Sequence, residues 1–220
     1  MPRMARIVVP GLPHHITQRG IRGYRTFFKT LDYLTYIELL KEFRRTSGVS
    51  IWAYCLMPNH IHVVAVPDAK DSLAKLFRQV HSRYALRTNG THGWKGHLWQ
   101  ERYYSSVMDE AHTLAALRYV ELNPVRAGLC KKPQEWRWSS IHSHIGTRQD
   151  EIVDTAATRK LVPDWRSFVH ADCPAALQDS LRKSTRTGRP AGDDDFIDLL
   201  ERKTGKTIPK RTRRKCKSTK

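Results

Sequence analysis

The chain has 220 residues, with 39 Lys and Arg against 21 Asp and Glu, and a formal net charge of +18. So large an excess of positive charge indicates a polyphosphate partner, with nucleic acid as the first candidate. The sequence contains no apolar stretch near the roughly 20 residues that cross a bilayer and no signal-peptide core at its N-terminus, so we expect a cytoplasmic, nucleoid-associated protein without a membrane partner.

The first part of the chain alternates strand-like and helix-like segments. Helices are predicted where apolar residues recur every three or four positions, and strands where β-branched and aromatic residues concentrate. Ser72 and Asp109 are expected to cap helices, and Pro124, which lacks a backbone N–H, is expected to stop the last one. In chain order we predict a strand at 14–18, a helix at 31–44, strands at 51–57 and 60–67, a helix at 72–89, a strand at 98–107 and a helix at 110–123.

This order of elements predicts the fold class. Strands interleaved with helices in this way favour an antiparallel sheet with helices on one face, a ferredoxin-like α+β arrangement. Residues 1–149 carry 22 basic and 10 acidic side chains. Their number is typical of one domain.

The remainder of the chain differs in charge and composition. Residues 150–203 carry 9 basic and 11 acidic side chains, with an apolar helical pattern around Phe196 and Leu200, so we predict a small helical appendage on a loose linker. Residues 204–220 carry 8 basic and no acidic side chains, which predicts a disordered tail that lies along phosphates. A solvated tail without a role is the alternative. The expected DNA contacts of this tail are Lys210, Arg211, Arg213 and Arg214.

Two histidines, His60 and His62, are separated by one apolar residue on a predicted strand. Side chains alternate between the faces of a strand, so both imidazoles project from the same side. Two imidazoles on one face can hold one divalent metal ion. A single His-x-His also occurs by chance with one histidine as an ordinary hydrogen-bonded surface residue, so the pair alone leaves both interpretations open.

Tyr119 and Asn123 lie four residues apart on the last predicted helix of the first domain, and are therefore neighbours on one helical face. A tyrosine can attack phosphorus when cations lower its pKa from about 10 and a metal polarises the phosphoryl oxygens, and an asparagine offers a carbonyl oxygen as a third hard ligand. The alternative is a half-buried core tyrosine and an asparagine that caps the helix. Glu121 should point away from Tyr119, which makes it a doubtful base.

Nucleic-acid recognition is expected to rest on basic residues beside aromatic ones. Arginine contacts phosphate, and an aromatic ring stacks on a base with roughly 1 to 3 kcal/mol per stacked base. The expected contacts are Arg19, Arg22, Tyr24, Arg25, Arg102, Tyr103 and Tyr104. No spacing marks the other histidines as ligands, and tryptophan is usually buried, so we expect structural or surface roles for His14, His15, His81, His92, His97, Trp52, Trp136 and Trp138.

Four segments carry a more specific signal when they are taken together. In order they are 56–64 (LMPNHIHVV), 96–104 (GHLWQERYY), 118–129 (RYVELNPVRAGL) and 136–140 (WRWSS). This combination resembles the REP-associated tyrosine transposases, a group of single-tyrosine HUH transposases. The resemblance extends from about Pro10 to His144.

The resemblance implies a ferredoxin-like HUH nuclease domain over residues 1–149. It implies that this domain binds hairpin-forming single-stranded DNA, such as REP-like repeats, and uses Mg²⁺ or Mn²⁺. Cleavage and strand transfer would proceed through a covalent 5′-phosphotyrosine. By motif position, His60 and His62 would be metal ligands, Tyr119 the nucleophile and Asn123 the third ligand.

Two other classes of function stay open from the sequence. A domesticated, non-catalytic DNA-binding regulator would keep the same charge and motifs but would not cleave a labelled single strand. A metallohydrolase would use water and form no covalent adduct with DNA. The protein is expected to be a monomer or a homodimer, with Tyr119 meeting the histidines of its own chain or of a partner.

Overall fold

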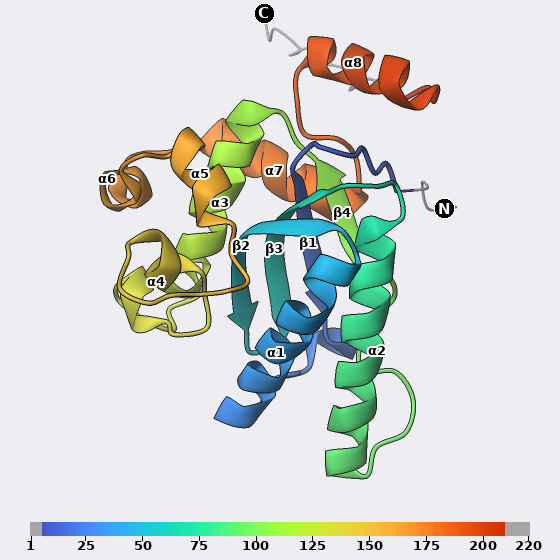
Figure 1. Ribbon diagram of the computed structural model, residues 1–220, viewed down its shortest axis with the longest axis vertical. Helices are drawn as coiled ribbons and strands as arrows, with labels where there is room; N and C mark the ends of the chain where they lie inside the picture. Colours follow the sequence, from blue (N-terminus) through green and yellow to red (C-terminus); the bar gives the residue numbers. More distant parts are fainter. Residues whose placement is uncertain (1–5, 210–220) are drawn as a thin grey trace, which may run out of the picture.

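A four-stranded antiparallel sheet forms the centre of the protein in a computed structural model, which describes residues 6–209 (Figure 1). The strands are β1 (His14–Arg19), β2 (Val49–Met57), β3 (His60–Pro67) and β4 (Tyr104–Val107), in the order β2-β3-β1-β4. A turn at Pro58-Asn59 separates β2 from β3, as predicted. The ferredoxin-like α+β prediction is confirmed.

Helices cover both faces of this sheet, not one. Helices α1 (Thr30–Thr46) and α2 (Ser72–His92) lie on one face, and α3 (Glu110–Arg126) lies on the other (Figure 1). The strands are apolar on both sides: Ile61 and Val63 of β3 join the cluster beneath α1 and α2, whereas Val64 packs with Leu117 and Val120 of α3. The expectation of one covered face was therefore wrong, because burial on both faces requires two helical layers.

Several element boundaries differ from the predicted ones. Helix α2 passes through Asn89-Gly90 and ends at Gly93, whose positive φ suits glycine. Pro124 lies inside α3, which continues for two more residues, so the loss of one N–H donor does not end the helix at this position. Ser72 is the first residue of α2 and Asp71 its N-cap, whereas Asp109 caps α3 as predicted by accepting a hydrogen bond from the backbone N–H of His112. Strand β4 begins only at Tyr104.

The segment after residue 149 is helical, as predicted, but packs against the first domain. After the short α4 (Ile141–His144), its helices are α5 (Thr155–Leu161), α6 (Trp165–His170), α7 (Ala175–Thr187) and α8 (Asp194–Thr204). Trp165 and Leu181 are buried in the same apolar cluster as α3. The stretch between α7 and α8 is tied to the end of β4, where Ala191 donates to the Val107 carbonyl. These contacts do not agree with a loosely linked appendage.

The first residues of the predicted basic tail are also packed. Ile208 is buried in a cluster with Ile7, Val9 and Leu200, and its backbone N–H donates to Glu201 Oε1. The predicted DNA contacts at Lys210, Arg211, Arg213 and Arg214 lie outside the described residues. Within residues 6–209, no helix has the length and apolar character needed to cross a bilayer.

Candidate functional site

A cavity of about 470 Å³ opens between the sheet and helices α3 and α7. Its walls include His60 and His62 of β3, Tyr119 of α3 and Thr185 of α7. The histidines face α3 because the alternate residues Ile61 and Val63 face α1 and α2. The predicted histidine pair and the predicted tyrosine therefore meet at one site within a single chain.

Each of the two histidines has one ring nitrogen engaged. Their ring centroids are 4.9 Å apart, with 80° between the planes. The Nδ1 atom of His60 lies 2.6 Å from Oδ1 of Asn59, and an amide oxygen only accepts, so His60 donates through Nδ1 and keeps the lone pair on Nε2. The Nδ1 atom of His62 lies 3.0 Å from Nε2 of His15.

A third histidine, His15 of β1, lies behind this pair. Antiparallel pairing places Thr17 opposite His62, so His15 is two residues farther along and on the same face. Its ring is nearly parallel to that of His62, with centroids 5.2 Å apart. The Nδ1 atom of His15 lies 2.8 Å from Thr185 Oγ1. The structural or surface role predicted for His15 leaves out this position at the cavity, because the pairing of β1 with β3 leaves no local mark in the sequence.

Burial keeps these imidazoles neutral near pH 7. Loss of solvation, together with a smaller effect of nearby Arg19, lowers the pKa of His60 to about 4. Burial lowers the pKa of His15 to about 3 and that of His62 well below its ordinary value. Because a metal binds the unprotonated nitrogen of an imidazole, the neutral state is the one that metal coordination requires.

The ring of Tyr119 lies edge-on to the rings of His62 and His15. Its ring centroid is 5.4 Å from that of His62 and 6.0 Å from that of His15. Two guanidinium groups lie near the same ring, with the carbon of Arg126 at 4.9 Å and that of Arg182 at 5.9 Å from its centroid. The Tyr119 ring thus lies between the buried imidazoles and two cationic groups.

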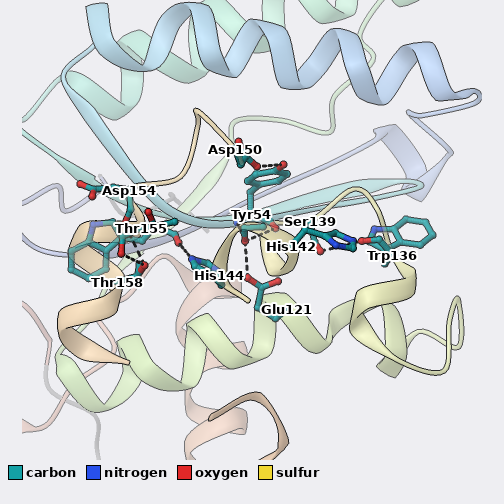
Figure 2. A network of polar contacts seen from close by, with 12 residues as sticks. Tyr54, Glu121, Trp136, Ser139, His142, His144, Asp150, Asp154, Thr155 and Thr158 are labelled. Carbon is teal, nitrogen blue, oxygen red and sulfur yellow. Dashed lines mark hydrogen bonds and ion pairs between the residues drawn. The ribbon is translucent and has the colours of Figure 1, made fainter. Parts of the chain in front are cut away.

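Asn123 and Glu121, on the same helix, are not among the residues that line the cavity. Asn123 is buried and does not line it, so its role as a third ligand stays a prediction. Glu121 is fully buried and faces the opposite direction, as expected, where its Oε1 accepts hydrogen bonds from Ser140 and His144 at 2.7 Å each (Figure 2). Glu121 therefore cannot serve as a base for Tyr119.

The cavity supplies part of the donor set that Mg²⁺ or Mn²⁺ requires. Within residues 6–209, no three His, Cys, Asp or Glu side chains are arranged to hold a metal ion. His60 and His62 nevertheless each leave Nε2 without a hydrogen bond to any described residue. Two imidazoles suit a site that amide, phosphate or water oxygens complete, since Mg²⁺ in particular keeps several non-protein ligands.

The predicted DNA contacts among the described residues fall into three groups. Arg19 and Tyr104 line the cavity, and Arg22, Tyr24, Arg25 and Arg102 are exposed outside it. Tyr103 is buried, with its ring against Phe77 and beneath the guanidinium of Arg6. This placement does not agree with the base-stacking role expected for Tyr103, because its ring packs on Phe77 of α2 in the core and is not open to a base.

Helix α7 supplies wall residues that sequence reasoning missed. Thr185, Arg182 and Arg186 all line the cavity, although they lie more than 50 residues after Tyr119 in the chain. Nothing in the local pattern of α7 indicates which part of the sheet it will cover.

Trp138 is buried and stacked on Tyr33, as expected for a core residue.

The family model described as "Transposase IS200 like" matches residues 12–123. This protein belongs to the IS200-like transposase family. The match includes the two cavity histidines and Tyr119, and it ends before α4 to α8. The part of the cavity that α7 provides therefore lies outside the matched region.

Individual relatives agree with this assignment. The REP-associated tyrosine transposase of Escherichia coli strain K12 is 21% identical over 127 residues, which are 57% of this chain and 74% of the relative. A Haemophilus influenzae relative of the same kind is 24% identical over 135 residues, which are 53% of this chain and 76% of that protein. The resemblance to the REP-associated tyrosine transposases is thus confirmed.

A solved structure has the same fold. It is a REP-associated tyrosine transposase bound to a REP hairpin, with a TM-score of 0.57 and 21% sequence identity. The similarity covers 69% of this chain and 90% of that one. At this identity, the match establishes the shared fold.

Proposed function

We propose that this IS200-like transposase binds hairpin-forming single-stranded DNA, such as REP-like repeats, and cleaves and rejoins it through a covalent bond to Tyr119. The observation that carries the proposal is the position of the Tyr119 ring against His62, at a cavity with neutral imidazoles and arginines. The hairpin bound to the structural relative supports the same class of DNA for this chain.

The chemistry is an exchange of phosphodiester bonds. The Tyr119 oxygen attacks the scissile phosphorus, the bond from phosphorus to the 3′ oxygen breaks, and a 5′-phosphotyrosine and a free 3′-OH result. The phenolic proton passes to solvent, and the 3′ oxygen takes up a proton from solvent. Because no water is consumed, a 3′-OH from another strand can reverse the step and join new ends.

The cavity residues divide the remaining tasks. His60 and His62 would hold a divalent metal ion, Mg²⁺ or Mn²⁺, which when bound draws charge from the phosphoryl oxygens. The guanidinium groups of Arg126 and Arg182 lie near the Tyr119 ring and add positive charge for the phosphate that this residue attacks. Arg19, exposed at the cavity wall, contacts the DNA backbone. Asn123 as third ligand remains part of the proposal.

Incubation with DNA and metal tests the proposal directly. The full-length protein is mixed with labelled single strands from repeats beside its own gene and Mn²⁺, and the products are separated on a denaturing protein gel. A labelled band at the size of the protein plus DNA is expected. Binding without cleavage would identify a non-catalytic regulator, and cleavage without an adduct would identify a hydrolase that uses water.

Removal of either predicted metal ligand, His60 or His62, should strongly slow cleavage but leave DNA binding intact. His60→Ala and His62→Ala are each expected to slow adduct formation on the order of 100-fold or more, because losing about 3 kcal/mol of transition-state stabilisation has this effect. Affinity for the hairpin should change little, since the metal acts mainly on the transition state. His170→Ala, on an exposed residue of α6, is the matched control. Undiminished cleavage in either cavity variant, or in excess EDTA, would contradict the metal assignment.

Deletion of residues 210–220 should weaken binding to all single strands alike. The deleted part carries seven basic residues and no acidic one, and leaves the buried Ile208 in place. Each phosphate contact that is lost should lower the slope of log affinity against log salt by about 0.7. Affinities for a hairpin repeat and a scrambled strand are measured at several salt concentrations. Loss of the preference for the hairpin at an unchanged slope would show that this segment reads structure.

A further inference from the structure

We propose that Thr185 of α7 is a positioning residue that acts through His15 to fix the tautomer of His62. The inference rests on the proposed function, in which His62 binds the metal ion through Nε2. Thr185 lies outside the residues that the family model matches. The C-terminal segment would therefore take part in the site that the first domain contains.

Four groups form one continuous chain of hydrogen bonds from helix to cavity. Thr185 Oγ1 donates to the Leu181 carbonyl one turn earlier, at 2.8 Å. The same oxygen lies 2.8 Å from Nδ1 of His15, and Nε2 of His15 lies 3.0 Å from Nδ1 of His62. The exposed fractions of Thr185, His15 and His62 are 7%, 1% and 6%. Water therefore competes little for these polar atoms.

The Leu181 carbonyl determines the direction of every bond in this chain. A carbonyl only accepts, so it takes the proton of the Thr185 hydroxyl, and the Thr185 oxygen is left to accept from Nδ1–H of His15. A neutral imidazole has one N–H, so Nε2 of His15 must accept, and it accepts from Nδ1–H of His62. The lone pair of His62 is then on Nε2.

His60 has the same tautomer as His62, but a different hydrogen bond fixes it. Its Nδ1 donates to Oδ1 of Asn59, which leaves the lone pair on Nε2. Both histidines thus keep the lone pair of Nε2 for a metal ion, with Nδ1 held by a hydrogen-bond partner. Without the Thr185 hydroxyl, His15 could adopt either tautomer, and His62 would follow it. A His62 ring that carries its proton on Nε2 cannot coordinate through that atom.

Thr185→Val tests the relay, with Thr185→Ser as the matched control. Valine keeps the branched shape but lacks the hydroxyl, and serine keeps the hydroxyl. The tautomers of His15 and His62 are read from two-bond ¹H–¹⁵N NMR correlations of the full-length, metal-free protein. Wild type and Thr185→Ser should show Nδ1–H for both rings, whereas Thr185→Val should show a mixture of tautomers. Circular dichroism and thermal melting establish that each variant is folded.

A second readout measures metal affinity without DNA. Mn²⁺ binding, followed by electron paramagnetic resonance, should weaken about 10- to 100-fold in Thr185→Val and be restored in Thr185→Ser. A double variant with His15→Phe should bind no more weakly than His15→Phe alone, because both changes interrupt one chain.

Two results would overturn the proposal: a wild-type His62 that carries its proton on Nε2, or a Thr185→Val variant in which the tautomers of both rings are unchanged. The tautomer measurement needs no metal ion. Failure of the wild type to bind Mn²⁺ would therefore contradict the proposed metal site, while the NMR result alone decides whether the relay exists.

Discussion

Replacing Tyr119 by phenylalanine eliminates the covalent protein–DNA adduct and leaves the protein folded. The change removes one oxygen from a partly exposed ring at the cavity wall, and no hydrogen bond to that oxygen is formed by any described residue. A substitution that conserves volume in this way should change the free energy of unfolding by less than about 1.5 kcal/mol. The adduct should fall below detection, because the attacking atom is absent.

A tyrosine outside the site provides a matched control for the Tyr119→Phe variant. Tyr33→Phe removes the hydroxyl of a tyrosine on α1, on the opposite face of the sheet, and should leave adduct formation intact. Hairpin affinity is measured for all variants by fluorescence anisotropy. An adduct that persists in Tyr119→Phe but disappears on the further change Tyr104→Phe would assign the nucleophile to Tyr104, which also lines the cavity.

Replacing Glu121 by alanine is expected to destabilise the fold by about 3 to 5 kcal/mol, the cost of removing one member of a buried pair. The side chains of Glu121 and His144 are 0% and 1% exposed, and their oxygen and nitrogen lie 2.7 Å apart (Figure 2). The other ring nitrogen of His144 lies 2.9 Å from the Trp52 carbonyl, and the ring stacks on Trp165. Loss of Glu121 would leave His144 and Ser140 without their buried partner.

Denaturant unfolding measures this loss of free energy of unfolding. Two further variants show how much of the loss comes from the charge of the pair and how much from its packing. Glu121→Gln keeps an oxygen acceptor of the same size, so it should destabilise the fold less than Glu121→Ala. His144→Ala should destabilise it as Glu121→Ala does, and the two losses should not add, because both remove the same pair. A loss below about 1 kcal/mol in Glu121→Ala would show that the pair contributes little net stability.

This buried pair also bears on the site. Glu121 is two residues from Tyr119 on α3 and ties that helix to β2 through Ser140, whose hydroxyl oxygen also accepts from the backbone N–H of Tyr54. Because the two side chains leave the helix on different sides, the pair can hold α3 in place without entering the cavity. The position of Tyr119 against His62 thus depends on a network on the far side of its helix.

Local patterns in the sequence determined most of the helices and strands, and they identified the histidine pair and the tyrosine of the site. The alternation of side chains on a strand places His60 and His62 on one face whatever the rest of the chain does. The helical repeat places Glu121 away from Tyr119, and Asp109 begins the helix that carries both. Each of these features depends on residues within a few positions of one another, so it is encoded where it occurs.

Only the tertiary structure decided what surrounds these residues. His15 joins the site because β1 pairs with β3 in one register, and Thr185 joins it because α7 packs on the same face, 170 residues later. The second helical layer, the burial of Tyr103 and the packing of Ile208 likewise come from contacts between distant segments. Hydrophobic burial is not directional, so an apolar pattern states that a face will be covered but not by which segment.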